Sequence, residues 1–320
     1  MRVLVTGATG FVGRSLCETL SRQGHLVRAA LRSDRLLPAC ITEHVVVGDI
    51  CATTRWETVL DGVDAIVHLA ARAHILDDNP SNEHLYLDVN LHGTECLAKA
   101  AARVGVKRFV FLSSVKVNGE GAGARPYTAL DVPHPEDAYG KSKWLAEQAV
   151  VQVAEQSGMR AAIVRAPLVY GPGVRANFLR LLRCVDRQIP LPLGAIRNRR
   201  SLVSVWNLCD LLTNLLKNST PSGVAWMVSD GADLSTPALI RGLGRAMGRR
   251  VRLLPVSPRI LYAGGLLVGR KAEVGRLCGS LAVDISSTRE RLSWSPPLSV
   301  EEGLARTVSW YLSEGRSRGQ

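Results

Sequence analysis

The sequence predicts an α/β fold: a doubly wound parallel sheet followed by a smaller C-terminal α/β lobe. Three observations lead to this prediction. Short apolar segments alternate with helical segments through the first half of the 320-residue chain, which is typical of a parallel sheet with helices on both faces. A glycine-rich loop lies between the first apolar segment and the first helical one. Glycine and proline become frequent after Arg165, which indicates a second lobe.

The elements of the first half follow from two periodicities in the sequence. Short apolar runs of strand length predict strands, and apolar residues at helical spacing predict helices. We expect strands at residues 2–5, 26–31, 44–47, 65–69, 108–112 and 160–165, and helices at residues 11–22, 83–104 and 139–156.

Composition excludes several classes of protein. No window offers the roughly 18 uninterrupted apolar residues of a transmembrane helix. Residues 260–268 could touch a membrane surface, but a buried helix or a dimer face is the favoured interpretation. The net charge of +12 is dispersed and lacks the interleaved aromatic residues of a nucleic-acid groove, so no nucleic-acid partner is predicted. The chain runs directly into its first motif and its seven cysteines are scattered. We therefore expect a cytoplasmic protein without a secretory signal, disulfide framework or metal site.

The glycine-rich loop after the first strand has the spacing of a dinucleotide site. Gly7 suits a tight turn, Gly10 permits close approach of a pyrophosphate, and Gly13 lets the helix pack on the sheet. The N-terminus of the following helix offers free N–H groups to the anion. The sequence therefore predicts a Rossmann-like cofactor site, with contacts from Gly7, Thr9, Gly10, Phe11, Val12 and Gly13.

The end of the second strand bears on the choice of cofactor. An acidic residue usually binds the ribose 2′-hydroxyl there, but this chain has Arg32. Arg32 either pairs with a 2′-phosphate or is simply solvated, so NADP(H) is slightly favoured over NAD(H). Asp49, followed by Ile50, either accepts a hydrogen bond from the adenine amine or caps a helix.

A tyrosine and a lysine carry the predicted chemistry. Tyr139 and Lys143 stand four residues apart, so they share one face of a helix. A nearby ammonium lowers the pKa of a phenol, and the pair can then exchange a proton with an alcohol or carbonyl oxygen. A second donor to that oxygen is expected from Ser113 or Ser114, which lie at the end of the fifth expected strand, where ligands of parallel sheets bind.

These motifs, with His68 to Ala71, Arg165 to Pro167 and Tyr170 to Gly173, resemble the extended short-chain dehydrogenase/reductase family in its sugar-nucleotide epimerase/dehydratase branch. The resemblance implies a catalytic triad of Ser114, Tyr139 and Lys143, a UDP-sugar substrate and a homodimer. It implies further cofactor contacts from Leu69, Ala70, Ala71, Pro167, Tyr139 and Lys143, and substrate contacts from Ser114, Lys116, Asn177 and the diphosphate-binding Arg200.

Departures from the family pattern narrow the reaction. Val115 and Lys116 stand where dehydratases of the family carry an acid/base pair, so a dehydratase is not expected. Residues 113–120 are similar to reductases that form UDP-N-acetylquinovosamine and also resemble proteins labelled UDP-glucose 4-epimerases. The leading hypothesis is therefore a 4-keto reductase that interconverts a UDP-4-keto-6-deoxy-N-acetylhexosamine and UDP-N-acetylquinovosamine by hydride transfer at C4, in the synthesis of surface polysaccharide (O-antigen) precursors. Arg32 and Lys116 favour it. The alternatives are a UDP-glucose or UDP-N-acetylhexosamine 4-epimerase and a cofactor-sensing regulator.

The predicted domain organisation has two parts and a tail. Residues 1–166 form a dinucleotide-binding domain, with a return segment near residues 200–217. Residues 167–314 form mainly the substrate-binding lobe, and residues 315–320 are expected to fray.

Overall fold

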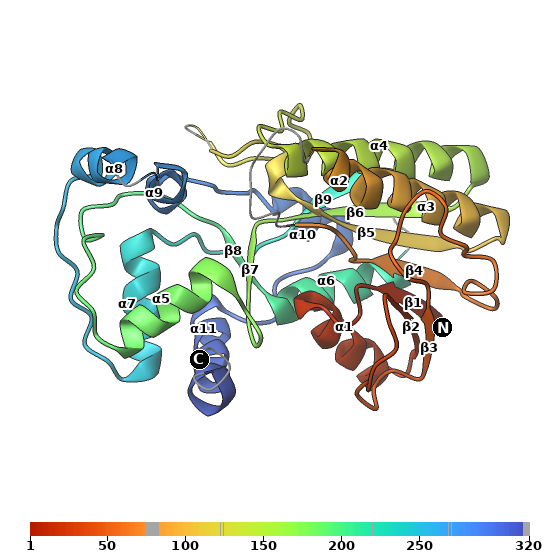
Figure 1. Cartoon of the computed structure of the whole chain (residues 1–320), viewed down its shortest axis with the longest axis horizontal. Coiled ribbons are helices and arrows are strands. Elements are labelled where there is room, and N and C mark those ends of the chain that lie inside the picture. The colour runs from red at the N-terminus through yellow and green to blue at the C-terminus, as the bar shows by residue number, and fades with distance from the viewer. Residues whose placement is uncertain are drawn as a thin grey trace.

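The computed structural model describes residues 1–73, 83–121, 123, 125–218, 221–267, 269 and 271–315. Its centre is a parallel sheet of seven strands in the order β3-β2-β1-β4-β5-β6-β9 (Figure 1). The strands are β1 (Arg2–Thr6), β2 (Leu26–Leu31), β3 (Glu43–Val46), β4 (Ala65–His68), β5 (Arg108–Ser114), β6 (Arg160–Ala166) and β9 (Val224–Met227). The strand order reverses between β1 and β4, which is where such sheets bind ligands.

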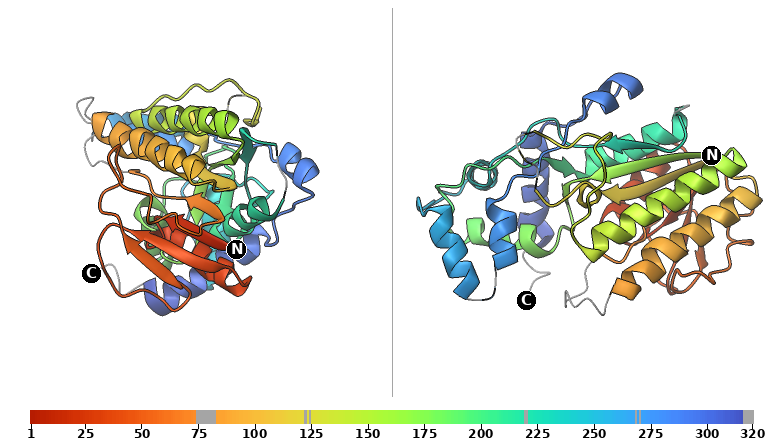
Figure 2. Two further views of the ribbon diagram at one scale, coloured as in Figure 1. Left: turned by 90° about the vertical axis from the view of Figure 1, so that its right-hand side faces the viewer. Right: turned by 90° about the horizontal axis from the view of Figure 1, so that it is seen from above.

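Helices cover both faces of the sheet. They are α1 (Phe11–Arg22), α2 (Glu83–Leu87), the π-helical η2 (Asp88–Gly93), α3 (Thr94–Arg103), α4 (Ala138–Ser157) and α6 (Val205–Lys217). Apolar side chains of α1 and α6 form one core against the sheet, and those of α3 and α4 form the other. Figure 2 shows α3 and α4 side by side along their face. The predicted doubly wound α/β fold is therefore confirmed.

The expected elements of the first half lie within two residues of the observed bounds. The single helix expected at 83–104 is observed as three consecutive helical segments, α2, η2 and α3. β9, which joins the sheet beside β6, was not expected. Its four residues are apolar, but they lie in the part of the chain that was assigned to the second lobe. α6 lies within the expected return segment and packs beside α1.

The second lobe has a core of its own. Its short strands β7 (Leu168–Tyr170) and β8 (Leu202–Ser204) pair in parallel. Its helices are α5 (Ala176–Asp186), α7 (Thr236–Met247), α8 (Pro258–Leu267), α9 (Lys271–Cys278) and α11 (Val300–Trp310). The last of these runs into the π-helical η4 (Tyr311–Gly315). The short helix α10 (Ser286–Leu292) lies against β9 of the large sheet. No helix of the described residues is long and apolar enough to cross a membrane. The domain boundaries stay a prediction, and residues 316–320 of the expected tail lie outside the described residues.

Candidate active site

The glycine loop between β1 and α1 leaves room for a pyrophosphate. Gly7 has a φ of +68°, and a Cβ there would lie 2.9 Å from the Ala70 nitrogen. A Cβ on Gly13 would lie 2.1 Å from the carbonyl oxygen of Gly7. Among the described residues no side chain caps α1, and its first turn holds no acidic residue. The loop and the helix end therefore fit the anionic centre of a dinucleotide.

A buried histidine fixes the segment beside this loop. His68 pairs with Thr6 across β1 and β4, with 2.6 Å between its Nδ1 and Thr6 Oγ1. Thr6 Oγ1 also accepts from the backbone N–H groups of Leu69 and Ala70. Its own proton is then donated to Nδ1, which leaves Nε2–H to donate to Thr94 Oγ1 at 2.9 Å. Burial, followed by the charge of Lys143, lowers the pKa of His68 to about 3, so the ring is neutral and structural.

Asn90 connects this segment to the helix that carries the expected catalytic residues. Its Oδ1 accepts from the Arg72 N–H at 2.8 Å, and its Nδ2 donates to the Arg72 carbonyl and to Ser142 Oγ, both at 3.0 Å. Asn90 lies in the π-helical η2, a rare geometry that is common at functional sites. Ile50, a predicted cofactor contact, packs so closely on Gly93 that a Cβ there would lie 2.6 Å from Ile50 Cγ2.

The structure brings the predicted catalytic residues together at the carboxyl end of the sheet. Ser114 is the last residue of β5, and Tyr139 and Lys143 lie on consecutive turns of α4. The Ser114 hydroxyl faces Tyr139 and counters part of the rise in the tyrosine pKa. The Lys143 ammonium is buried 3.8 Å from the centroid of the Phe111 ring. The α4 N-cap is Asp137, whose Oδ1 accepts from the Gly140 N–H at 2.6 Å.

The protonation of these groups differs from the sequence-based expectation. Burial, followed by the charge of Asp137, raises the pKa of Tyr139 to about 12. Burial also lowers the pKa of Lys143 to about 7, and the charge of Glu147 opposes that shift. The phenol pKa is thus raised rather than lowered, because removal from water disfavours the charged phenolate. Tyr139 is a protonated hydroxyl at neutral pH, suited to donate to a developing alkoxide.

Beneath these residues lies a buried polar network that sequence reasoning missed. The Glu147 carboxylate accepts from Arg165 Nη2 at 2.7 Å and from Nε at 3.1 and 3.2 Å. It also accepts from Ser113 Oγ, while Arg165 Nη1 donates to Asn118 Oδ1 at 3.2 Å. The signals were present in the sequence. Glu147 stands four residues after Lys143, and Arg165 interrupts an apolar strand that buries every residue after its first.

Two basic residues predicted to meet ligand are each held by carboxylates. The Lys116 ammonium contacts Asp137 and, at 2.6 Å, Glu120. Arg32 forms a two-pronged pair with Asp49, at 2.6 Å from Nε to Oδ1 and 3.1 Å from Nη2 to Oδ2. The Arg32–Asp49 pair is exposed to solvent, so its energy is small, but it sets a negative charge beside the guanidinium.

The remaining predicted substrate residues belong to the second lobe. Asn177 is exposed in the first turn of α5. Arg200 lies between backbone segments, and its Nη1 donates to the carbonyls of Arg276 at 2.6 Å and Gly279 at 3.1 Å. Pro167 separates β6 from β7. Within the described part of the chain, no group of three His, Cys, Asp or Glu side chains is placed to hold a metal ion.

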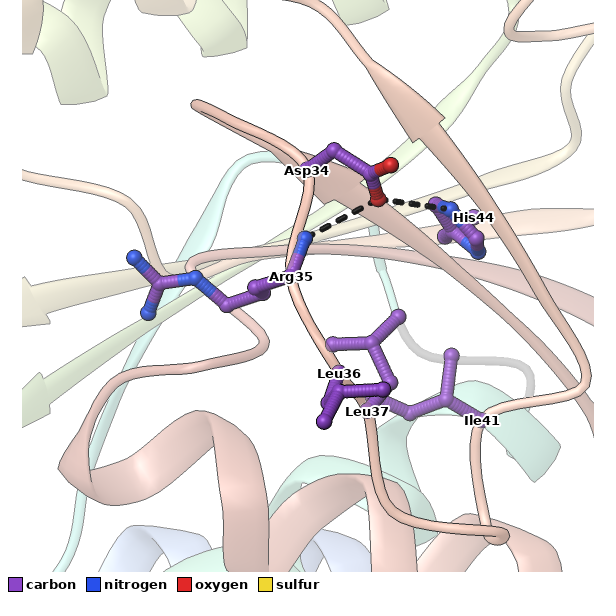
Figure 3. A pocket seen from close by; sticks show the side chains of 6 residues that line it. All are labelled: Asp34, Arg35, Leu36, Leu37, Ile41 and His44. Atoms are coloured by element: carbon purple, nitrogen blue, oxygen red, sulfur yellow. Dashed lines mark hydrogen bonds and ion pairs between the residues drawn. The ribbon is translucent and has the colours of Figure 1, made fainter.

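A separate cavity of about 490 Å³ lies in the connection from β2 to β3. Figure 3 shows its lining residues, Asp34, Arg35, Leu36, Leu37, Ile41 and His44. Asp34 Oδ1 accepts from the Arg35 N–H at 2.9 Å and lies 3.3 Å from His44 Nε2. None of these residues is a predicted cofactor or substrate contact.

A parallel sheet that reverses at a glycine loop, with Ser, Tyr and Lys at its carboxyl end, defines a nucleotide-dependent oxidoreductase of the short-chain type. The chain belongs to the NAD dependent epimerase/dehydratase family, which matches residues 3–228. It is 43% identical over 319 residues to a UDP-glucose 4-epimerase of Vibrio cholerae, covering 97% of this chain and 95% of that protein. The protein is thus an enzyme of this family, as the resemblance implied.

Solved structures agree with the fold. The UDP-glucose 4-epimerase of Thermotoga maritima with UDP-glucose superposes with a TM-score of 0.79 at 21% identity, over 98% of this chain and 99% of that one. The UDP-glucuronic acid 4-epimerase of Bacillus cereus in complex with NAD gives a TM-score of 0.77 at 21% identity, over 97% and 98%. At this identity the likeness concerns the fold alone. The narrower resemblance to reductases that form UDP-N-acetylquinovosamine stays a prediction.

Proposed function

We propose that the protein is a UDP-hexose 4-epimerase that uses NAD(H). The observation that carries the proposal is the grouping of Ser114, at the end of β5, with Tyr139 and Lys143 on consecutive turns of α4. The Vibrio cholerae relative, 43% identical over almost the whole chain, is named a UDP-glucose 4-epimerase and supports the proposal.

The ion pairs in the structure favour the epimerase over the 4-keto reductase. The sequence-based case for the reductase depended on Lys116 as a ligand for one carbonyl pose and on Arg32 as a ligand for NADPH. Lys116 is tied to Glu120 and to Asp137, the N-cap of α4. Arg32 is tied to Asp49, whose charge would repel a 2′-phosphate. Both arguments for the reductase are therefore weakened, and the B. cereus neighbour with NAD favours NAD(H).

The proposed chemistry assigns each residue one task. Bound NAD(H) would supply the acceptor and donor for the C4 hydride. The Tyr139 hydroxyl exchanges a proton with the sugar O4. Ser114 donates a hydrogen bond that orients the same oxygen, and the Lys143 ammonium, when protonated, stabilises negative charge on the tyrosine oxygen. Arg200 is the proposed ligand of the substrate diphosphate.

A mass balance tests the proposal. The protein as purified is incubated with UDP-glucose or UDP-N-acetylglucosamine without added cofactor, and the sugar nucleotides are resolved. We expect many C4-epimer molecules per enzyme. If no epimer forms, and NADPH is consumed one for one with a UDP-4-keto-6-deoxy sugar, the protein is the reductase instead.

A tyrosine variant tests the assigned chemistry. Tyr139→Phe is expected to lower turnover at least ~100-fold, because it removes the proton donor. The exposed Tyr262→Phe is the matched control and is expected to leave turnover unchanged. Turnover of Tyr139→Phe within about threefold of the wild type would contradict the assignment.

A further inference from the structure

Helix α8 presents an apolar surface at the outer end of the second lobe. It packs on α9, and the two helices lie side by side away from the parallel sheet (Figure 1). Only Gly265 of α8 is buried, and Leu261 packs partly on the core of the lobe. Large apolar side chains project into solvent, with exposed fractions of 64% for Ile260, 65% for Leu266 and 87% for Leu267. Clustered exposure of this kind marks an interaction surface.

The sequence around α8 is strongly basic. From the start of α8 to the end of α9, residues 258–278 contain four Lys or Arg residues and one acidic residue, Glu273. Arg259 on α8 and Arg276 on α9 are exposed, and Glu273 lies 3.5 Å from Arg180.

We propose that α8 docks the protein on an anionic lipid surface. Exposed leucines that enter the boundary between headgroups and acyl chains gain the free energy of leaving water. Arg259 on α8 and Arg276 on α9 would meet anionic headgroups, and long basic side chains can hold their charge at the interface while their stems stay apolar. This inference is independent of the proposed reaction.

The same charges argue against a second copy as the occupant. A two-fold symmetric dimer through α8 would place this patch against itself. Its excess of basic residues would then face an identical excess, and like charges across an interface are unfavourable. An anionic bilayer matches both the apolar side chains and the sign of the charge. An acidic protein matches only the sign.

Flotation of the whole protein with vesicles tests the proposal. One set of vesicles contains phosphatidylglycerol and phosphatidylethanolamine, and the other contains phosphatidylcholine alone. We expect binding to the first set at low salt, weaker binding at 0.5 M NaCl because surface charge is screened, and little binding to the second. A Leu266→Glu/Leu267→Glu variant is expected to bind at least ~30-fold more weakly, because two inserted leucines are lost.

The matched control is a Leu130→Glu/Val132→Glu variant, which changes two side chains that are 91% and 85% exposed elsewhere. It is expected to bind vesicles much as the wild type does, apart from the small effect of its added charge. Circular dichroism and the melting temperature show that each variant is folded.

Four results would overturn the proposal. Equal binding of both vesicle types removes the anionic lipid surface as the occupant, and wild-type binding by the α8 variant removes the helix as the docking site. A dimer in gel filtration that the α8 variant dissociates, without vesicle binding, makes the helix an interface between copies. Binding to polyglutamate without vesicle binding points to an acidic protein partner.

Discussion

Replacing Glu147 by Gln tests whether the buried ion pair beneath the active site holds its parts together. The carboxylate joins three elements, since it lies on α4, pairs with Arg165 of β6 and accepts from Ser113 of β5. Ser113 precedes Ser114, and Lys143 lies one turn before Glu147 on α4. A change at Glu147 is therefore expected to affect both the fold and the titration of Lys143.

The magnitude follows from the burial of the pair. The side chains of Arg165 and Glu147 are 7% and 5% exposed. Removing one partner of a buried pair leaves an uncompensated charge and costs about 3–5 kcal/mol. Gln keeps an acceptor oxygen, so we expect a loss near the lower end of that range. The Glu147 charge also opposes the effect of burial on Lys143. Without it the pKa of Lys143 falls below about 7, and the alkaline limb of turnover moves to lower pH.

Urea unfolding at pH 7.5 and the pH profile of turnover measure the two effects. Glu155→Gln, at an exposed position near the end of the same helix, is the control and is expected to change the free energy of unfolding by under about 0.5 kcal/mol. A double variant, Glu147→Gln with Arg165→Met, removes both charges and is expected to recover part of the loss. The reasoning is refuted if Glu147→Gln loses under about 1 kcal/mol and its alkaline limb does not move.

Three further changes probe other parts of the site. Gly13→Ala would place a Cβ 2.1 Å from the carbonyl oxygen of Gly7, so calorimetry is expected to find no cofactor binding. The control variant is Gly264→Ala, whose new Cβ meets nothing within 4 Å, and it is expected to bind the cofactor normally. His68 stays neutral in the folded protein until about pH 3, so between about pH 6.5 and pH 3 the unfolded chain binds one more proton than the folded chain. The free energy of unfolding therefore falls by about 1.4 kcal/mol for each pH unit of acidification. His68→Gln is expected to flatten that slope, and an unchanged slope contradicts the neutral ring. Arg200→Ala is expected to weaken UDP binding by about 1.5–3 kcal/mol, and equal UDP affinity in both proteins would leave Arg200 only its backbone contacts at the end of α9.

The features that could be predicted from the sequence are those with a regular local pattern. The first six strands and the helices between them follow from apolar periodicity, and the glycine loop follows from its spacing. The strand β9 is short and lies after Arg165, in the part of the chain that was assigned to the second lobe. Its place in the sheet depends on pairing with β6, some sixty residues earlier, which no local window contains.

In the active site, too, the features with a local sequence pattern could be predicted and those that depend on packing could not. Spacing alone placed Tyr139 and Lys143 on one face of α4, and the strand end placed Ser114 near them. The pKa shifts were not predictable, because spacing does not tell how deeply a side chain is buried. The partners of Arg32 and Lys116 were missed as well, since Asp49 and Asp137 approach them only after the strands and helices have packed.

The path of the chain between the two lobes limits how the protein can be divided. A fragment that ends at residue 166 would lack α6, which covers part of the apolar face shared with α1, and β9, which pairs with β6. Such a fragment would expose a leucine-rich core face and an unpaired strand edge, and both favour aggregation. Moving the nucleotide-binding half into another protein therefore requires residues 205–227 as well, joined to it by a new connection.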